Sequence, residues 1–246
     1  MKKILFPVLM FPVLMFIPQH KKIRIFMAGD STMSVKDSSA YPETGWGMPF
    51  VYFWDTTVQI VNLAKNGRST KSFIEEGLWR KIYDNAVPGD YVFIQFGHND
   101  EVQTKKASTT ESEFRANLIR MVTDAKQKQS FPVLITPVAR RKFNSAGKVE
   151  GTHEVYAQIV RDVAIAQKVP LIDLDKKAQA LYQKLGAESS KLLFVQLQPG
   201  ENPNYPNGKE DNTHFNELGA RLVAEMVLQD IGIQMPELAA RIVKRK

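Results

Sequence analysis

Short apolar runs of strand length recur along the chain, and polar, turn-forming residues follow several of them. Residues 23–28, for example, read IRIFMA and stop at Gly29. Runs that are apolar almost throughout are typical of strands covered on both faces, as in a parallel sheet. The pattern therefore predicts strands at residues 23–28, 58–63, 91–96, 133–136 and 171–174.

Between these runs, apolar residues recur at the spacing of helices that bury one face. Thr110 and Glu113 form a capping box, which predicts that a helix begins there. Strands that alternate with helices indicate an α/β fold, in which a parallel sheet is flanked by helices and functional residues follow the carboxyl ends of the strands. The three helical stripes are Phe114, Leu118, Met121, Val122 and Ala125; Val155, Ile159 and Val163; and Leu218, Leu222, Val223, Met226 and Val227.

The first twenty residues differ from the rest of the chain. Met1-Lys2-Lys3 precedes an apolar run, residues 4–17, that contains a duplicated FPVLM. A charged start before a short apolar run is typical of a secretory signal, and the run is shorter than the roughly 20 residues that span a membrane. We expect residues 1–20 to be a signal peptide and 21–246 a single domain, secreted or periplasmic, without stable membrane association after cleavage. No small-x-small motif marks the cleavage point, so an uncleaved membrane anchor is the alternative.

Composition narrows the partners and the chemistry. The chain has 33 Lys and Arg against 26 Asp and Glu, a net charge of +7, which suits an acidic polysaccharide, a nucleic acid or an anionic membrane. Scattered surface lysines would give the same value. No nucleic-acid module or phosphate-binding loop is present, so no nucleic acid is expected. The absence of cysteine excludes disulfides, a cysteine nucleophile and Cys-ligated metals.

Candidate chemistry follows three of the predicted strands. Ser31 stands at the first strand-to-helix turn, Gly67 after the second strand and Asn99 after the third. A serine hydroxyl is a possible nucleophile, whereas a glycine N–H and an asparagine amide are possible donors to an oxyanion. Each residue alone is equally typical of a helix cap or a turn.

Asp211 and His214 supply the remaining groups of such a site. An aspartate three residues before a histidine can accept from its Nδ1, which leaves Nε2 free to take a proton from a serine. Metal binding is the alternative, but no further cluster has the spacing of metal ligands, and no metal is expected.

Ser31, Gly67, Asn99 and His214 follow one another along the chain in the order Ser, Gly, Asn and His. In this order they resemble the motifs of the SGNH, or GDSL-type, hydrolase superfamily, which is named for these four residues. The chain is most similar to the rhamnogalacturonan acetylesterases of carbohydrate esterase family 12. The motifs that carry this resemblance are GDSTMS at Gly29, YPETGWG at Tyr41, NGRST at Asn66, GHND at Gly97 and DNTHFNELGA at Asp211.

The resemblance implies a three-layer αβα, flavodoxin-like fold with a five-stranded parallel sheet. It also implies an enzyme that removes acetyl groups from plant cell-wall rhamnogalacturonan without a cofactor. Ser31 would be the nucleophile, His214 the base and Asp211 its partner. Gly67 and Asn99 would form the oxyanion hole with the Ser31 backbone N–H.

The substrate contacts are less defined. Trp46 is a candidate for stacking on a sugar, although a core position is the alternative. Arg68 is a candidate for binding a uronate carboxylate, with a structural ion pair as the alternative. His98 is the third candidate for a substrate contact. The polar loop 198–212 is expected to form one wall of the site. We expect a monomer that binds an acetylated polysaccharide or oligosaccharide. The alternatives are an acetylxylan esterase, a lipid or thioester hydrolase of the same superfamily, and a non-catalytic carbohydrate-binding module.

Overall fold

A five-stranded sheet forms the centre of the computed structural model, which describes residues 22–243. The strand order is β2-β1-β3-β4-β5, and every neighbouring pair is parallel. The predicted α/β sheet is therefore confirmed. The strands are β1 Ile23–Gly29, β2 Val58–Asn62, β3 Tyr91–Gln95, β4 Phe131–Ile135 and β5 Leu171–Ile172.

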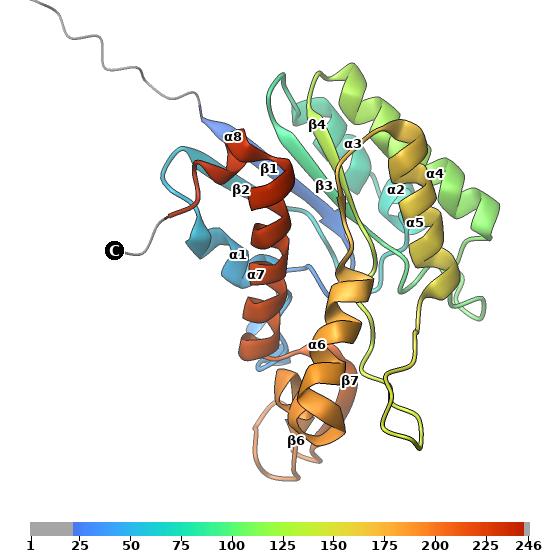
Figure 1. Ribbon diagram of the computed structural model, residues 1–246, viewed down its shortest axis with the longest axis vertical. Coiled ribbons are helices and arrows are strands. Elements are labelled where there is room, and N and C mark those ends of the chain that lie inside the picture. The colour runs from blue at the N-terminus through green and yellow to red at the C-terminus, as the bar shows by residue number, and fades with distance from the viewer. Residues whose placement is uncertain (1–21, 244–246) are drawn as a thin grey trace, which may run out of the picture.

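Helices cover both faces of this sheet, as Figure 1 shows. Successive side chains of a strand point to opposite faces, so Ile25 packs in one core and Phe26 in the other. The first core lies under α1, α6, α7 and α8, and the second lies under α2, α3, α4 and α5. The three-layer αβα architecture is thus confirmed. The helices are α1 Gly47–Phe50, α2 Thr70–Glu75, α3 Leu78–Asn85, α4 Glu111–Gln127, α5 Glu154–Gln167, α6 Leu174–Ser189, α7 Glu217–Gln234 and α8 Pro236–Ala239, with 3₁₀ turns at Ser38–Ala40, Val51–Phe53 and Ser190–Leu193.

Two sequence predictions need correction at the level of single elements. The fifth strand ends at Ile172 because Asp173 caps α6, and its side chain accepts from the Lys176 N–H. Val155 and Leu218, expected in the helical stripes, are about half exposed at 50% and 51%. In the first turn of a helix the buried face is poorly defined by spacing alone.

A small antiparallel ribbon was not predicted. It pairs β6, Phe194–Leu197, with β7, Lys209–Phe215, below the sheet in Figure 1. The polar loop expected over 198–212 therefore gives way to a strand at Lys209. This strand carries both Asp211 and His214, so the ribbon sets their position.

The predicted signal peptide, residues 1–20, lies outside the described residues. No helix within residues 22–243 combines the length and the hydrophobicity needed to cross a bilayer.

Candidate active site

The loops after β1, β2 and β3 meet the β7 ribbon around one cavity of about 280 Å³. Parallel strands bring their carboxyl ends to the same edge of the sheet, which explains why residues far apart in sequence converge there. The cavity is lined by Ser31, Glu43, Asn66, Gly67, His98, Asn99, Lys105, Arg140, Thr213 and His214.

The turn after β1 presents Ser31 at the edge of this cavity. The buried Asp30 carboxylate accepts from the backbone N–H and the hydroxyl of Thr32, both at 2.9 Å, which fixes the turn. Burial raises the pKa of Asp30. A side chain at Gly29 would lie 2.8 Å from Met33 Sδ and 3.0 Å from the Gln95 carbonyl oxygen, so the close approach requires glycine.

His214 connects Ser31 to Asp211. His214 Nδ1 lies 2.8 Å from Asp211 Oδ2, and Nε2 lies 2.9 Å from Ser31 Oγ. An ionised carboxylate only accepts, so Nδ1 carries the proton and Nε2 is free to accept from the serine hydroxyl. The geometry is that of a nucleophile, a base and a group that orients the base.

The Asp211 carboxylate is itself held in place by backbone groups. Its Oδ1 accepts from the N–H groups of Thr213 at 2.7 Å and His214 at 2.9 Å. Burial acts to raise the pKa of Asp211, but the hydrogen bond and charge of His214, together with these backbone donors, outweigh it and hold the pKa well below its ordinary value. The Asp211 carboxylate is therefore ionised at neutral pH.

Gly67 and Asn99 also line the cavity. Gly67 has φ +76°, a left-handed conformation that glycine adopts without strain. The Asn99 side chain is buried between two partners: Nδ2 donates to the Arg68 carbonyl at 3.1 Å, and Oδ1 accepts from Lys105 Nζ at 2.9 Å. These bonds fix which end of the amide is the donor.

Asp100, next to Asn99, ties the third strand to the second helix. Its carboxylate accepts from the Thr70 N–H at 3.0 Å, from the Thr70 hydroxyl at 2.5 Å and from the Thr109 hydroxyl at 3.1 Å. Burial raises the pKa of Asp100 to about 7. This contact anchors the start of α2 and, through it, the loop that carries Gly67.

The sequence model of the GDSL-like lipase/acylhydrolase family matches residues 27–222, most of the chain. The chain belongs to this family. It is therefore a carboxylic ester hydrolase, and the family predicted from the sequence motifs is confirmed.

Individual relatives of this GDSL-like hydrolase agree with that assignment. Over 211 residues the chain is 43% identical to the rhamnogalacturonan acetylesterase RhgT of Bacillus subtilis, covering 86% of this chain and 90% of RhgT. The crystal structure of the YxiM protein of B. subtilis superposes with a TM-score of 0.75 at 27% identity, over 87% of this chain and 57% of that one. The acetylxylan esterase Axe2 of Geobacillus stearothermophilus shares the fold, with a TM-score of 0.60 at 14% identity over 86% and 95% of the two chains.

One of the three predicted substrate contacts of this GDSL-like hydrolase is wrong, and a second has a protein partner. Trp46 is completely buried, and its Nε1 donates to Gln95 Oε1 at 2.7 Å, so it is a core residue and cannot stack on a sugar. Arg68 does not line the cavity. Its guanidinium donates to Glu76 at 2.9 Å and to the Asn66 carbonyl at 2.8 Å, which is the structural ion pair.

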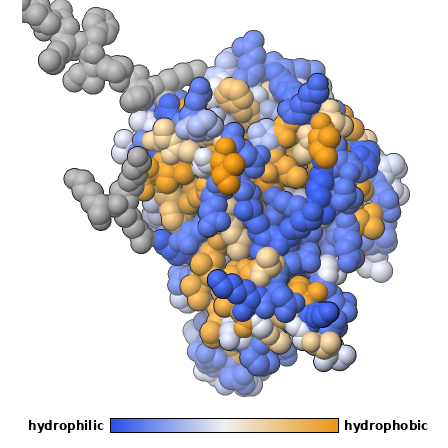
Figure 2. All heavy atoms as spheres, viewed as in Figure 1, coloured by the Kyte–Doolittle hydropathy of each residue, from blue (hydrophilic) through white to orange (hydrophobic). Residues whose placement is uncertain are grey.

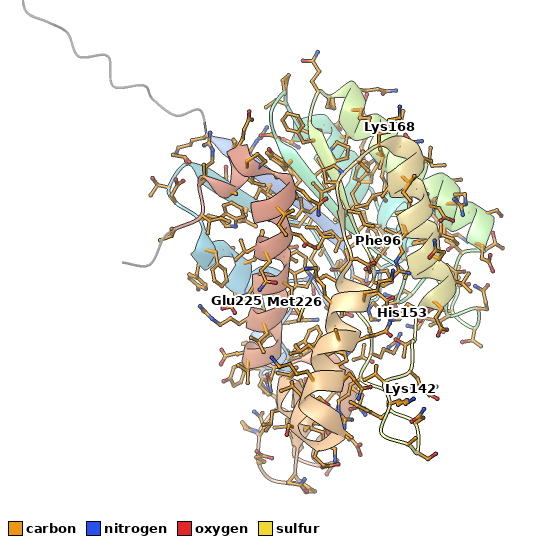
Figure 3. The ribbon with its side chains drawn as sticks, in the orientation of Figure 1. Phe96, Lys142, His153, Lys168, Glu225 and Met226 are labelled. Carbon is orange, nitrogen blue, oxygen red and sulfur yellow. The ribbon has the colours of Figure 1, made fainter. Side chains whose placement is uncertain are left out.

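His98, the third, lines the cavity but is only 3% exposed. Its ring lies 4.2 Å from that of His153, which stands at the start of α5 in Figure 3. Burial, followed by the charge of His153, lowers the pKa of His98 well below its ordinary value. The ring is therefore neutral, and it forms part of the cavity wall.

The predicted wall from the 198–212 loop is also wrong in most of its length. Asn204 donates to the Ser38 and Tyr41 carbonyls, and the Tyr205 hydroxyl donates to the Ala40 carbonyl. The loop thus packs on the segment before α1. The β7 ribbon contributes Thr213 and His214 to the cavity instead.

The cavity also contains three charged residues that were not predicted from the sequence, Glu43, Lys105 and Arg140. Glu43 belongs to the YPETGWG motif, which was the one available signal, but the motif does not say what the carboxylate faces. Lys105 and Arg140 stand in segments without periodicity. The part of the chain that the structure describes contains no group of three or more His, Asp or Glu arranged to hold a metal ion.

Proposed function

We infer that this hydrolase is a secreted serine esterase that removes O-acetyl groups from a plant cell-wall polysaccharide, with rhamnogalacturonan as its substrate. The observation that carries the proposal is the hydrogen-bonded series from Asp211 through His214 to Ser31 Oγ, with distances of 2.8 Å and 2.9 Å. The relatives named as rhamnogalacturonan acetylesterases favour this substrate.

The proposed reaction begins when Ser31 Oγ attacks the acetyl carbonyl carbon and His214 Nε2 takes the hydroxyl proton. Charge then develops on the carbonyl oxygen, where the N–H groups of Ser31 and Gly67 and the Asn99 amide are the available donors. When the ester bond breaks, His214 returns the proton to the departing sugar oxygen. Water repeats the two steps on the acetyl-enzyme, which releases acetate and restores Ser31.

The size and charge of the cavity favour a short acyl group on an acidic sugar. A volume of about 280 Å³ holds an acetyl group and part of one sugar ring, but leaves little room for a fatty acyl chain. Lys105 and Arg140 both line the cavity. Arg140 lies 3.6 Å from the Glu101 carboxylate, whereas Lys105 has no carboxylate partner among the described residues. A uronate carboxylate next to the ester would supply the missing negative charge.

Hydrophobic residues on the face seen in Figure 2 are interrupted by hydrophilic ones instead of forming one continuous area. The small cavity, with its charged lining, favours a carbohydrate ester over a lipid ester. Secretion rests on the charged and apolar pattern of residues 1–20.

The test is acetate release from acetylated rhamnogalacturonan, homogalacturonan and xylan, compared side by side. Wild type should prefer the first, and Ser31→Ala should lose on the order of 10⁴-fold or more in kcat. Ser130→Ala, which removes a hydroxyl at the amino end of β4, is the matched control and should keep full activity.

Each other outcome assigns a different function. A preference for xylan would make the protein an acetylxylan esterase. Hydrolysis of only long-chain esters would favour a lipid substrate. Binding of polysaccharide without hydrolysis of 4-nitrophenyl acetate would contradict an esterase altogether, and full activity of Ser31→Ala would refute the nucleophile.

A further inference from the structure

A second carboxylate lies next to the imidazole of His214. Glu43 Oε1 is 3.9 Å from His214 Nε2, whereas Asp211 contacts the other ring nitrogen, Nδ1. Glu43 is only 7% exposed, and the part of it that remains accessible lines the cavity. The mechanism described above gives this buried charge no role.

Glu43 is paired with an equally buried lysine. Lys36 Nζ lies 2.6 Å from Glu43 Oε1, and the lysine side chain is 2% exposed. The same ammonium donates to Asn66 Oδ1 at 2.7 Å, on the residue before Gly67. The Lys36–Glu43 ion pair therefore lies next to His214 through Glu43 and binds the loop of the proposed oxyanion hole through Lys36.

Stability is a poor explanation for this pair. Burying two charges costs desolvation free energy, and replacement of such pairs by apolar residues is often neutral or stabilising. Burial acts to raise the pKa of Glu43, but the hydrogen bond from Lys36 and the charge of His214 outweigh it and lower the pKa. Glu43 is thus kept ionised beside the ring, where its charge acts on the imidazole.

The remaining charged groups near His214 do not duplicate this effect. Lys209, on β7, lies 3.4 Å from both Glu43 Oε2 and Asp211 Oδ2 and offsets each in part. Arg140 donates to the Thr213 hydroxyl, and buried His98 is neutral. Among the described carboxylates, Asp211 and Glu43 are the two that lie within 4 Å of the ring nitrogens.

We propose that Glu43 is a positioning residue for His214, which stabilises the imidazolium from its Nε2 side while Asp211 does so from Nδ1. The positive charge of Lys36 partly offsets the negative charge of Glu43 at the imidazole ring. Glu43 exchanges no proton: the proton moves from Ser31 Oγ to Nε2 and then to the departing oxygen. The proposal rests on the proposed esterase function.

The experiment compares pH profiles of kcat/KM for 4-nitrophenyl acetate. Loss of the negative charge in Glu43→Gln favours the neutral ring, so the midpoint of the acid limb should move down by about one pH unit. The plateau rate should fall roughly 5- to 10-fold because the imidazolium loses a stabilising charge. Lys36→Met removes the offsetting charge, so its midpoint should move up.

Two further variants separate this effect from damage to the fold. Glu210→Gln makes the same substitution at an exposed position on β7 and should leave the profile unchanged. The double variant Glu43→Gln/Lys36→Met buries no unpaired charge, so it remains testable if Glu43→Gln fails to fold. The midpoint of the double variant should lie between those of wild type and Glu43→Gln. If Glu43→Gln fails to fold, the midpoint of the double variant should still lie below that of wild type.

The order of the midpoints decides the question. A double variant at or above the wild-type midpoint, or single variants that shift in the same direction, would overturn the role of Glu43. Because wild type hydrolyses the probe in either case, these results leave the esterase function intact. Failure of wild type to hydrolyse any ester would instead refute the proposed function.

Discussion

Replacement of Asn99 by alanine tests whether its amide contacts charge that develops in the reaction. The side chain makes two hydrogen bonds, Nδ2 to the Arg68 carbonyl at 3.1 Å and Oδ1 from Lys105 at 2.9 Å. An oxyanion donor acts mainly in the transition state, so its loss should lower kcat and change KM little.

The two possible roles of Asn99 differ in magnitude as well as in kind. Loss of one oxyanion donor typically costs about 10²–10³ in kcat, or roughly 2.7–4 kcal/mol of transition-state stabilisation. The lost bond to the Arg68 carbonyl should lower the free energy of unfolding by about 1 kcal/mol. For a chain of this size, that corresponds to a melting temperature lower by about 2–4 °C. Loss of the hydrogen bond from the exposed Lys105 side chain should lower the free energy of unfolding by little more.

The assay is kcat per folded molecule with 4-nitrophenyl acetate, measured alongside the melting temperature. Asn85→Ala is the matched control. Asn85 Nδ2 also donates to a backbone carbonyl, that of Lys81 at 2.8 Å, but at the end of α3 and outside the cavity. The control should show a small loss of stability and an unchanged kcat.

The reasoning is refuted if folded Asn99→Ala keeps a near-normal kcat, whatever its melting temperature. A reduced stability with normal kcat would mean that Asn99 only holds the turn after β3. A raised KM with unchanged kcat would mean that the amide contacts the substrate equally in the ground state and the transition state.

Three other predictions follow from the charges and from the N-terminal segment. Asp211→Asn should lose on the order of 10⁴-fold in kcat, because an amide no longer fixes the proton on Nδ1 of His214; a folded variant with normal kcat would contradict this. Burial raises the pKa of Asp100 in the folded protein from its ordinary value of 3.8 to about 7. The free energy of unfolding that the protonated group contributes is therefore fully present below pH 3.8 and is lost as the pH rises through 7. The melting temperature of wild type relative to Asp100→Asn should therefore fall between about pH 4 and about pH 8, and a constant difference would refute the shift. Mass spectrometry of the exported protein should show that roughly the first 20 residues are removed, whereas an intact Met1 in the membrane fraction would favour an anchor.

The centre of the sheet was predictable because β1, β3 and β4 are mostly buried on both faces. Ile25 and Phe26 point to opposite faces and are both apolar and buried, so the run stands out without knowledge of its partners. The β6–β7 ribbon was not predictable. Its second strand, Lys209–Phe215, is mostly half-buried and polar, so it has no apolar run to reveal it.

The residues of the Ser31, Asp211 and His214 series were available from sequence because short motifs at strand ends specify them. The roles of Trp46 and Arg68 could not be decided from the sequence for a related reason. A tryptophan can pack in a core or stack on a sugar, and Trp46 packs in the core. An arginine can bind the carboxylate of a ligand or of the protein, and Arg68 binds Glu76. Only the position of their neighbours decides between these uses.

The sequence by itself determined the alternation of parallel strands with helices, the family, and the Ser31, Asp211 and His214 residues of the candidate site. Tertiary structure alone decided that a second carboxylate, Glu43, lies next to the imidazole. Glu43 lies 171 residues from His214 in sequence, yet its carboxylate is 3.9 Å from Nε2. Local patterns report on contacts within a few turns of the chain. Electrostatic interactions depend on distance in space and on burial, and these are set only when the loops at the edge of the sheet pack together.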